Sequence, residues 1–398
     1  MIKKLFKLGW LIGCFVILFL KKVIIIIFFK KRKINFSPKG KKIIFFDTKV
    51  PSNSSAGELS FIELYNYLES IASLRFIVKA PLSSTFKSDK IKNLEQITLR
   101  DAWRLRKLIV DSDYIVIMSP ESTLFFNFIS VFLWVINTDI VYYSTDIFSD
   151  RYRSEYEVTN SLSSLFYSYY YKFCEPLIWS SSAWCFSNRK DEAGIISTYN
   201  QSVSLVPTRV LYDFKIADLT MFEDKSKGEI NLLFVGGVGN APNISAVKFI
   251  FDELIYQLNL KFHNKWVLNL VGFGWEKYLF DNNFSSDNVK IFGVVSDERL
   301  QELYTQSFFS LAPLQFGSGV KGKVIEAMYN SLIVITTPVG AEGIECQTLV
   351  PRSSAEIMVD DINVFLGDQS FWKYTIDGYH DYLEENFGEV AMNKGLNV

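Results

Sequence analysis

The sequence contains little histidine and little cysteine. Two histidines, His263 and His380, occur in 398 residues, and neither lies in a glycine-rich loop or at the end of an expected strand. A histidine general base is therefore possible at only two places. The four cysteines are Cys14, Cys174, Cys185 and Cys346. They are scattered and form no CxxC pair, which predicts free thiols in a reducing compartment and no zinc site.

Neither sign of charge is in excess, since 42 lysines and arginines face 43 aspartates and glutamates. A protein that binds nucleic acid is normally basic overall, so this balance argues against that class, and we expect no nucleic-acid partner. Aromatic residues are abundant by contrast, with 35 phenylalanines and 20 tyrosines. The length of the chain is sufficient for two domains.

Residues 1–35 are predicted to form a hydrophobic membrane anchor or an interfacial helix. Two apolar runs, Leu8–Leu20 and Val23–Phe29, are separated by Lys21 and Lys22 and flanked on both sides by basic residues. Together they approach the roughly 20 residues that span a bilayer. Each central lysine would cost about 2.5–3.5 kcal/mol at the bilayer midplane, so a span and a helix in the headgroup region both remain open. A cleaved signal peptide is not expected.

Beyond this segment, short apolar runs alternate with amphipathic segments. KKIIFFD at 41–47 and WVLNLVG at 266–272 have the composition of buried strands. Alternation of this kind predicts an α/β protein with a doubly wound parallel sheet in each half. We place an N-terminal domain at 41–210, a C-terminal domain at 225–366 and a helical segment at 367–398.

The stretch from Leu311 to Glu345 has the most specific chemical pattern. An apolar run leads into a glycine-rich loop, then into a helix that begins near Lys323 and a buried strand, which together form one βαβ unit. The glycines of the loop are Gly317, Gly319 and Gly322. Lysine in the first turn opposes the helix dipole, so Lys321 and Lys323 beside helix N–H groups predict an anion site, such as one for phosphate. The alternative is a solvated loop in which Lys323 pairs with Glu326.

A second glycine turn follows the first strand of the C-terminal half. In NLLFVGGVGNAPN, the strand runs into the glycines Gly236, Gly237 and Gly239. Asn243 is predicted to be the N-cap of the helix that follows, and Ser296 and Asp297 are predicted to cap a later helix. The turn lacks the third glycine of a dinucleotide fingerprint, so it is weak evidence for a dinucleotide.

The stretch 311–345 resembles the nucleotide-sugar-binding segment of glycosyltransferase family 4, whose members have the GT-B fold. The matching positions are Pro313, Phe316, Gly317, Gly319, Val320, Lys321, Gly322, Lys323, Glu326, Ala327, Gly340, Ala341, Glu342 and Gly343. They reproduce the FGxGVKGKxxEA and TTPVGAEG motifs of one branch of that family. The resemblance implies two Rossmann-like domains that face a cleft, with residues 367–398 returning to the N-terminal domain. It further implies transfer of a sugar from a nucleotide diphosphate donor, usually with retention of anomeric configuration.

The resemblance also implies which residues form the site. The residues assigned to catalysis are Lys321 and Lys323, which would neutralise the departing diphosphate, and Glu326, which matches the second glutamate of the family's Glu-x7-Glu motif and would bind the ribose hydroxyls. The residues assigned to donor binding are Gly236, Gly237, Gly293, Val294, Gly317, Ser318, Gly319, Val320 and Glu326. Ser318 stands at the position of the first glutamate, which this branch commonly lacks. Neither a metal ion nor a cofactor other than the donor sugar nucleotide is implied.

In the N-terminal half the resemblance is fainter. Gly57 follows the first strand and matches a family glycine that faces the donor diphosphate and the acceptor. Asp146 and Arg151 match an acceptor-side Asp-Leu-His motif and its arginine, but Phe148 stands where the histidine would be. The alternatives are a plain strand-to-helix turn at Gly57, a helix cap by Asp146 and an ion pair made by Arg151.

Together these features predict a membrane-associated glycosyltransferase of surface polysaccharide or glycolipid biosynthesis. Its catalytic domains would lie on the cytoplasmic side of the inner membrane, and its acceptor would be a glycan or a lipid-linked molecule. Ser318 and Phe148 favour an alternative, a catalytically inactive nucleotide-sugar-binding or scaffold subunit of a polysaccharide assembly complex. A GT-B epimerase is a third possibility, against which the motifs offer no suitable histidines or carboxylates.

Overall fold

The computed structural model describes most of the chain from residue 35 onward. The described residues are 35–49, 56–79, 91, 93–97, 101–135, 138–208, 222–223, 228–263 and 265–398. The predicted membrane segment at 1–35 lies outside them, apart from its last residue. Within the described ranges, no helix combines the length and the apolar character needed to cross a bilayer.

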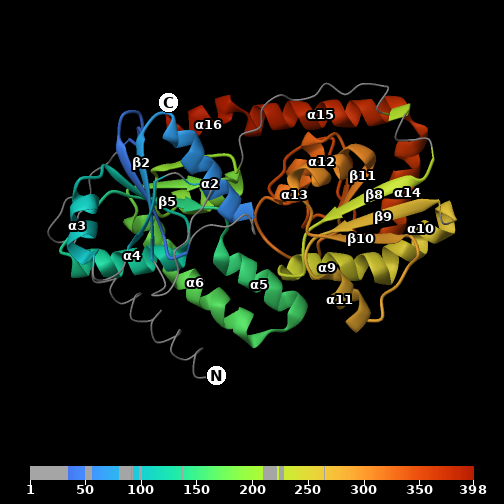
Figure 1. Ribbon diagram of the computed structural model, residues 1–398, viewed down its shortest axis with the longest axis horizontal. Helices are drawn as coiled ribbons and strands as arrows, with labels where there is room; N and C mark the ends of the chain where they lie inside the picture. Colours follow the sequence, from blue (N-terminus) through green and yellow to red (C-terminus); the bar gives the residue numbers. More distant parts are fainter. Residues whose placement is uncertain are drawn as a thin grey trace. The chain divides into compact units, whose positions relative to one another are not determined.

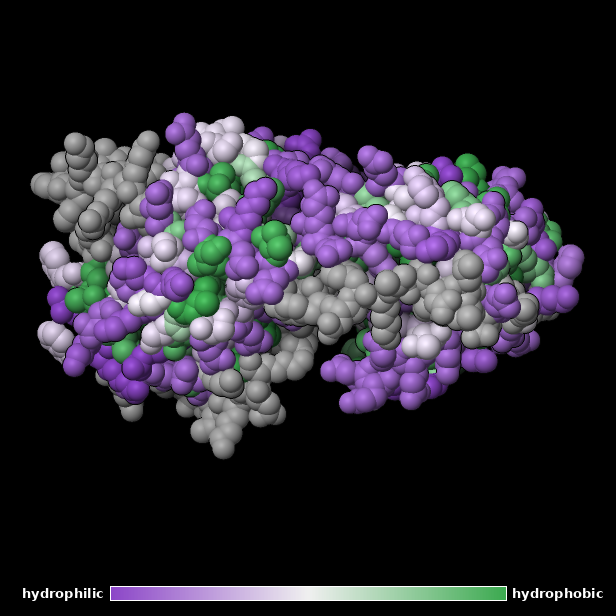
Figure 2. Space-filling view, turned by 90° about the horizontal axis from the view of Figure 1, so that it is seen from above, coloured by the Kyte–Doolittle hydropathy of each residue, from purple (hydrophilic) through white to green (hydrophobic). Residues whose placement is uncertain are grey.

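The chain forms two compact units, each built on one parallel sheet (Figure 1). The first unit contains the described residues of 35–156, 160–208 and 389–398, and the second contains residues 157–159 and the described residues between 222 and 388. This arrangement confirms the predicted class, an α/β protein with a parallel sheet in each half. Figure 2, seen from above, shows hydrophilic residues over much of that face and hydrophobic residues in smaller groups.

The sheet of the first unit has seven strands in the order β3-β2-β1-β4-β5-β6-β7, all parallel. The strands are β1 (Lys42–Asp47), β2 (Ser73–Lys79), β3 (Leu94–Ile97), β4 (Tyr114–Ile117), β5 (Ile140–Ser144), β6 (Trp184–Ser187) and β7 (Val203–Leu205). The central strands are apolar on both faces, as expected for a parallel sheet that helices cover on both sides.

Helices cover the two faces of this sheet in separate layers. One layer consists of α2 (Ala56–Glu69) and α16 (Glu389–Leu396), and it packs on Ile43 and Phe45 of β1. The other layer packs on Ile44 and Phe46, and on the neighbouring strands. It consists of α3 (Ala102–Val110), α4 (Pro120–Phe132), α6 (Leu162–Ser181) and α7 (Lys190–Ser197). Because successive strand residues point to opposite faces, β1 contributes to both cores. In addition, α5 (Phe148–Thr159) precedes α6 and buries none of its residues.

The sheet of the second unit has five parallel strands in the order β10-β9-β8-β11-β12. They are β8 (Ile230–Val235), β9 (Trp266–Val271), β10 (Val289–Gly293), β11 (Phe309–Ala312) and β12 (Ile333–Thr336). The helices are α9 (Ala241–Phe249), α10 (Ile255–Phe262), α11 (Trp275–Asp281), α12 (Asp297–Gln306), α13 (Gly322–Tyr329), α14 (Ala355–Gly367) and α15 (Gln369–Phe387). A π-helical turn, η2 (Ile250–Leu254), joins α9 to α10.

Two local predictions in the second unit had different outcomes. Ser296 is the N-cap of α12, where its hydroxyl accepts a hydrogen bond from the backbone N–H of Arg299, so the prediction is confirmed for Ser296, whereas Asp297 is the first residue of the helix. The prediction that Asn243 caps α9 was wrong, because the helix begins at Ala241 and its N-cap is Asn240. Asn243 lies inside the first turn, and its side chain is used elsewhere.

The C-terminal segment is shared between the units. The helix α15 packs with the second unit, against α13 and α14. The residues that follow it, 389–398, pack with the first unit, where Asn393 accepts a hydrogen bond from the hydroxyl of Tyr67 (2.6 Å). Of the predicted tail 367–398, the part that joins the first unit is therefore the short helix α16.

Candidate functional site

The candidate site lies at the carboxyl edge of the second sheet, where the glycine turn after β8 meets the end of β9. Gly236 and Gly272 have φ angles of +148° and +142°, which side-chain-bearing residues rarely adopt. A Cβ atom on Gly272 would lie 2.3 Å from the carbonyl oxygen of Gly236. The indole N–H of Trp275 donates to the same oxygen at 2.6 Å. The turn is thereby held against the neighbouring strand.

Lys323, in the first turn of α13, reaches this turn. Its ammonium donates to the side-chain oxygen of Asn243 at 2.6 Å and lies 4.5 Å from the ring centre of Phe234. Asn243 in turn donates through its amide nitrogen to the carbonyl of Gly237 (2.9 Å). A Cβ atom on Gly236 would approach the ammonium to 2.8 Å, so glycine is required where the lysine passes. Residues from three segments thus converge on one cation.

The pKa of Lys323 is lowered to about 7. Burial of the ammonium is the main cause; the carboxylate of Glu326 acts in the opposite direction, and the nearby cation of Lys321 lowers the pKa further. The side chain therefore occupies a place where its charged form is poorly stabilised by the protein alone. An anion that entered the site would supply the missing stabilisation.

Lys321, the N-cap residue of α13, is bound within its own loop. Its ammonium donates to the carbonyl of Gly319 at 2.5 Å and lies 3.3 Å from a carboxylate oxygen of Glu342. Gly317 and Gly319 have positive φ angles of +129° and +78°. An ion pair thus connects this loop to the segment around Glu342, and both lysines are brought to the start of one helix.

Two further residues of the predicted site lie beside these lysines. Glu326, one turn into α13, accepts a hydrogen bond from the hydroxyl of buried Tyr304 at 3.1 Å. The hydroxyl of Ser318 is buried and has no hydrogen-bond partner among the described residues. Buried hydroxyls are normally paired, so a bound molecule is the natural partner for this one. Val320 is buried in the core of the second unit.

Gly293 and Val294 extend the edge to β10. Gly293 has a φ angle of +62°, and its carbonyl accepts a hydrogen bond from the N–H of Gly272 at 2.8 Å. Val294 follows with 78% of its surface exposed. The structure therefore brings all the predicted donor-side glycines to one edge of one sheet. Backbone N–H groups, a helix N-terminus and two ammonium groups at that edge can bind a polyanion.

In the first unit, Asp146 and Arg151 lie together after β5, with 3.8 Å between a carboxylate oxygen and a guanidinium nitrogen. The alternative that Asp146 caps α5 is wrong, because Glu175 fills that position. The carboxylate of Glu175 accepts from the backbone N–H groups of Phe148 (2.7 Å) and Ser149 (3.2 Å). Burial raises the pKa of Glu175 to about 7, against the lowering effect of these hydrogen bonds.

Gly57 lies in the first turn of α2, as the second residue of that helix. The loop that precedes it, residues 50–55, is outside the described residues. At the end of β1, which leads into this loop, Asp47 is buried and accepts a hydrogen bond from the hydroxyl of Ser122 at 2.7 Å. Burial raises the pKa of Asp47.

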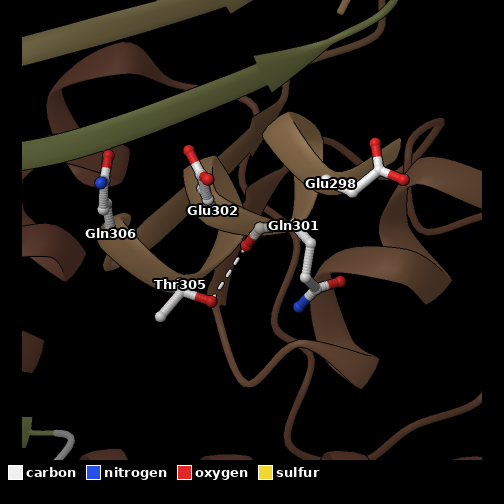
Figure 3. A pocket seen from close by; sticks show the side chains of 5 residues that line it. All are labelled: Glu298, Gln301, Glu302, Thr305 and Gln306. Carbon is white, nitrogen blue, oxygen red and sulfur yellow. Dashed lines mark hydrogen bonds between the residues drawn. The ribbon is translucent and has the colours of Figure 1, made fainter. Parts of the chain in front are cut away.

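A hollow of about 430 Å³ lies along α12 (Figure 3). It is lined by Glu298, Gln301, Glu302, Thr305 and Gln306, all on that helix. Two carboxylates and no basic group line it, so it is unsuited to an anionic ligand. The edge of the sheet remains the better candidate for the site.

Several contributors to the site were missed by sequence reasoning. Lys323 lies over the ring of Phe234, the glycine turn is bound by Trp275, and Glu326 is bound by Tyr304. None of these three aromatic residues belongs to a recognisable motif. The contact between Lys323 and Asn243 joins residues 80 positions apart. The sequence did offer one signal for this contact. The side-chain oxygen of an asparagine in a glycine turn, here Asn243, can accept a hydrogen bond from a lysine as well as cap a helix.

Comparisons of sequence find a match to a known family within the second unit. Residues 229–368 match the family described as glycosyl transferases group 1. A relative described as an uncharacterized 44.6 kDa protein in the cps region of Klebsiella pneumoniae is 24% identical over 245 residues. That alignment covers 59% of this chain and 58% of the relative, so the chain spans less than two thirds of the relative's length.

Comparisons of structure extend over most of the chain. The HepE protein of Anabaena, in complex with UDP-glucose, superposes with a TM-score of 0.63 at 13% identity, covering 90% of this chain and 98% of HepE. Sucrose-phosphate synthase of Thermosynechococcus elongatus superposes with a TM-score of 0.61 at 14% identity, covering 88% of this chain and 96% of the synthase. WaaG, a glycosyltransferase involved in lipopolysaccharide biosynthesis, superposes with a TM-score of 0.59 at 15% identity, covering 89% of this chain and 98% of WaaG. The chain thus has the fold of these proteins, the GT-B fold, and its residues 229–368 match the glycosyl transferases group 1 family.

Proposed function

We propose that the protein is a glycosyltransferase that moves a sugar from a nucleotide diphosphate donor to a glycan or lipid-linked acceptor. The observation that carries this proposal is the environment of Lys323. Its ammonium, with a pKa lowered to about 7, faces a glycine turn and the N-terminus of α13. A diphosphate has the negative charge that such a place favours, and the match to glycosyl transferases group 1 covers the same residues.

In this proposal the second unit binds the donor. Lys323 and Lys321 neutralise the negative charge that develops on the departing diphosphate, while the backbone of Gly237 and Gly319 comes close to it. Glu326 accepts hydrogen bonds from the ribose hydroxyls, for which a carboxylate is well suited. Ser318 supplies a hydroxyl to the donor. Gly293 and Val294 hold the base through their backbone. No metal ion and no separate cofactor is assigned to the reaction.

The first unit would receive the acceptor, with Gly57, Asp146 and Arg151 on that side. We propose transfer with retention of configuration, as in glycosyltransferase family 4, and a place in surface polysaccharide or glycolipid synthesis. The location of the Klebsiella relative in a cps region and the involvement of WaaG in lipopolysaccharide biosynthesis support that pathway class. Residues 1–35 would keep the protein at the cytoplasmic side of the inner membrane.

The donor can be identified by a thermal-shift screen of the full-length protein against UDP, GDP, ADP and their sugars. A ligand that binds the folded state raises its stability by RT ln(1 + [L]/Kd), so the correct base produces the larger rise in Tm. We expect one nucleotide family to respond, and the response to be lost in Lys323→Met and weakened in Glu326→Ala. Lys277→Met changes a lysine whose side chain is 83% exposed and serves as the matched control.

The second candidate is an inactive nucleotide-sugar-binding subunit, which the serine at position 318 favours. It predicts the same thermal shifts but no turnover. A folded wild-type protein that responds to none of the nucleotides would contradict both candidates.

A further inference from the structure

Large apolar side chains are exposed on one side of the first unit, on the outer surface of the layer formed by α3, α4 and α6. Trp103 of α3 is 81% exposed, and Phe132 and Trp134 at the end of α4 are 66% and 82% exposed. On α6, the exposed residues Leu162, Phe166, Tyr169 and Phe173 follow one another at intervals of four, three and four. That spacing places them on one face of the helix, turned away from the sheet.

Trp134 occupies a backbone position that does not favour it. Its φ angle is +53°, and the N–H of Val135 bonds to the carbonyl of Ser130 at 2.8 Å, which is a helix ending that normally has glycine at this place. A bulky residue there is strained, and its ring makes little contact that would offset the strain. An exposed indole held in this way points to a role at the surface rather than in the core.

Arg106 links the two tryptophans into one surface. Its guanidinium lies 5.9 Å from the ring centre of Trp103, and its Nε donates to the carbonyl of Leu133 at 3.1 Å, next to Trp134. Lys107 is exposed on the same helix as Trp103. We call the set Trp103, Arg106, Lys107, Phe132, Trp134 and the exposed stripe of α6 the aromatic surface.

The charges of α3 and α2, which cover opposite faces of the sheet, differ in sign. The α3 sequence, AWRLRKLIV, has three basic residues and no acidic one. The α2 sequence, AGELSFIELYNYLE, which covers the opposite face of the sheet, has three acidic residues and no basic one. Among the side chains described on α2 and α16, the large apolar one that is exposed is Val390. Aromatic groups and positive charge are therefore gathered on one side of this unit.

We propose that the aromatic surface docks on a lipid bilayer that contains anionic lipids. Indole and phenol rings favour the interface between headgroups and acyl chains, and basic side chains at its edge are attracted to anionic headgroups. The acidic α2 layer would face away from the bilayer. This inference builds on the proposed membrane location, but it concerns the folded first unit, and it would hold that unit close to a lipid-linked acceptor.

The test uses quenching of tryptophan fluorescence by lipids with brominated acyl chains. Trp10→Phe is introduced into the full-length protein so that the N-terminal segment does not contribute, and the protein is reconstituted into phosphatidylcholine vesicles with and without phosphatidylglycerol. We expect quenching in the anionic vesicles that falls by about half or more when Trp103→Phe and Trp134→Phe are added. Adding Trp372→Phe, which removes a buried indole, leaves the quenching unchanged. Lys107→Glu reduces it.

Quenching that is the same with and without Trp103 and Trp134 would overturn the proposal, even if the protein stays on the vesicles through residues 1–35. A dimer in light scattering that the same two substitutions dissociate would also overturn it, because a second copy would then be the occupant. The nucleotide thermal shift is measured on every variant. It is expected to stay at the wild-type value, which separates failure of docking from failure of the proposed transferase activity.

Discussion

Above about pH 8, binding of a nucleoside diphosphate should draw a proton from solution, because Lys323 is then largely neutral in the empty site. With a pKa of about 7, this lysine is only ~3% protonated at about pH 8.5. A diphosphate in contact with the ammonium favours the charged form and should return the pKa toward the ordinary value of about 10.4. A full return to that value amounts to ~0.96 proton taken up for each nucleotide bound at that pH.

The assay is isothermal titration of UDP, or of whichever nucleotide responds, in buffers that differ in ionisation enthalpy. The slope of the observed enthalpy against the ionisation enthalpy of the buffer gives the number of protons exchanged. The phosphate itself contributes little, since its last pKa is about 6. Lys323→Met should bind more weakly with a slope near zero, whereas Lys277→Met should behave as wild type. Tight binding by the wild type with no proton uptake would refute the assignment of Lys323 to the diphosphate.

Three further predictions concern stability and are each checked by urea unfolding. Gly272→Ala should lower the free energy of unfolding by about 2–4 kcal/mol, because the added Cβ would meet the backbone of the neighbouring turn. Gly239 faces open space, so Gly239→Ala should change the free energy of unfolding by less than about 0.5 kcal/mol. Equal effects would contradict the packing argument. The pKa of Glu175 is raised from 4.5 to about 7 in the folded state, so the unfolded state releases this proton first as the pH rises. As the pH rises from about 4.5 to about 7, the free energy of unfolding of the wild type should therefore fall by about 3 kcal/mol relative to that of Glu175→Gln. A difference between the two proteins that does not depend on pH would show that the pKa of this carboxyl is not perturbed. Trp134→Gly should gain about 0.5–1 kcal/mol by relieving a positive φ angle, and a loss would show that the exposed indole supports the fold.

Much of the fold could be predicted because buried parallel strands have a strong sequence pattern. The runs that became β1 and β9 are continuous and apolar, and each is followed by helical periodicity. The two edge strands of the first sheet, β3 (LEQI) and β7 (VSL), lack this pattern and were not predicted from the sequence. Segments this short and polar become strands through pairing with β2 and β6, and that pairing is not visible in the local sequence.

The candidate site was predictable where it depends on local spacing. Glycines in a loop and lysines at the start of a helix stand next to one another in the sequence, so the position of Lys323 could be inferred. Its partners could not, because Phe234 and Asn243 come from another segment and meet it only in the folded sheet. The error at Asn243 has a local cause: Pro242 stands in the first turn of α9, where proline is favoured, so the helix had to start earlier than the asparagine.

The central claim, that this site transfers sugar, is tested most directly by following a radiolabelled sugar from its nucleotide donor into a membrane-extract acceptor. The comparison is between wild type and Lys323→Met, with Lys277→Met as the control. We predict that label enters the acceptor with the wild type and the control, and that the rate falls at least ~100-fold in Lys323→Met, as for loss of a group that stabilises developing charge. Equal transfer by Lys323→Met and wild type would contradict the account of the site. Donor binding without any transfer by the wild type would instead identify the protein as the inactive sugar-nucleotide-binding subunit.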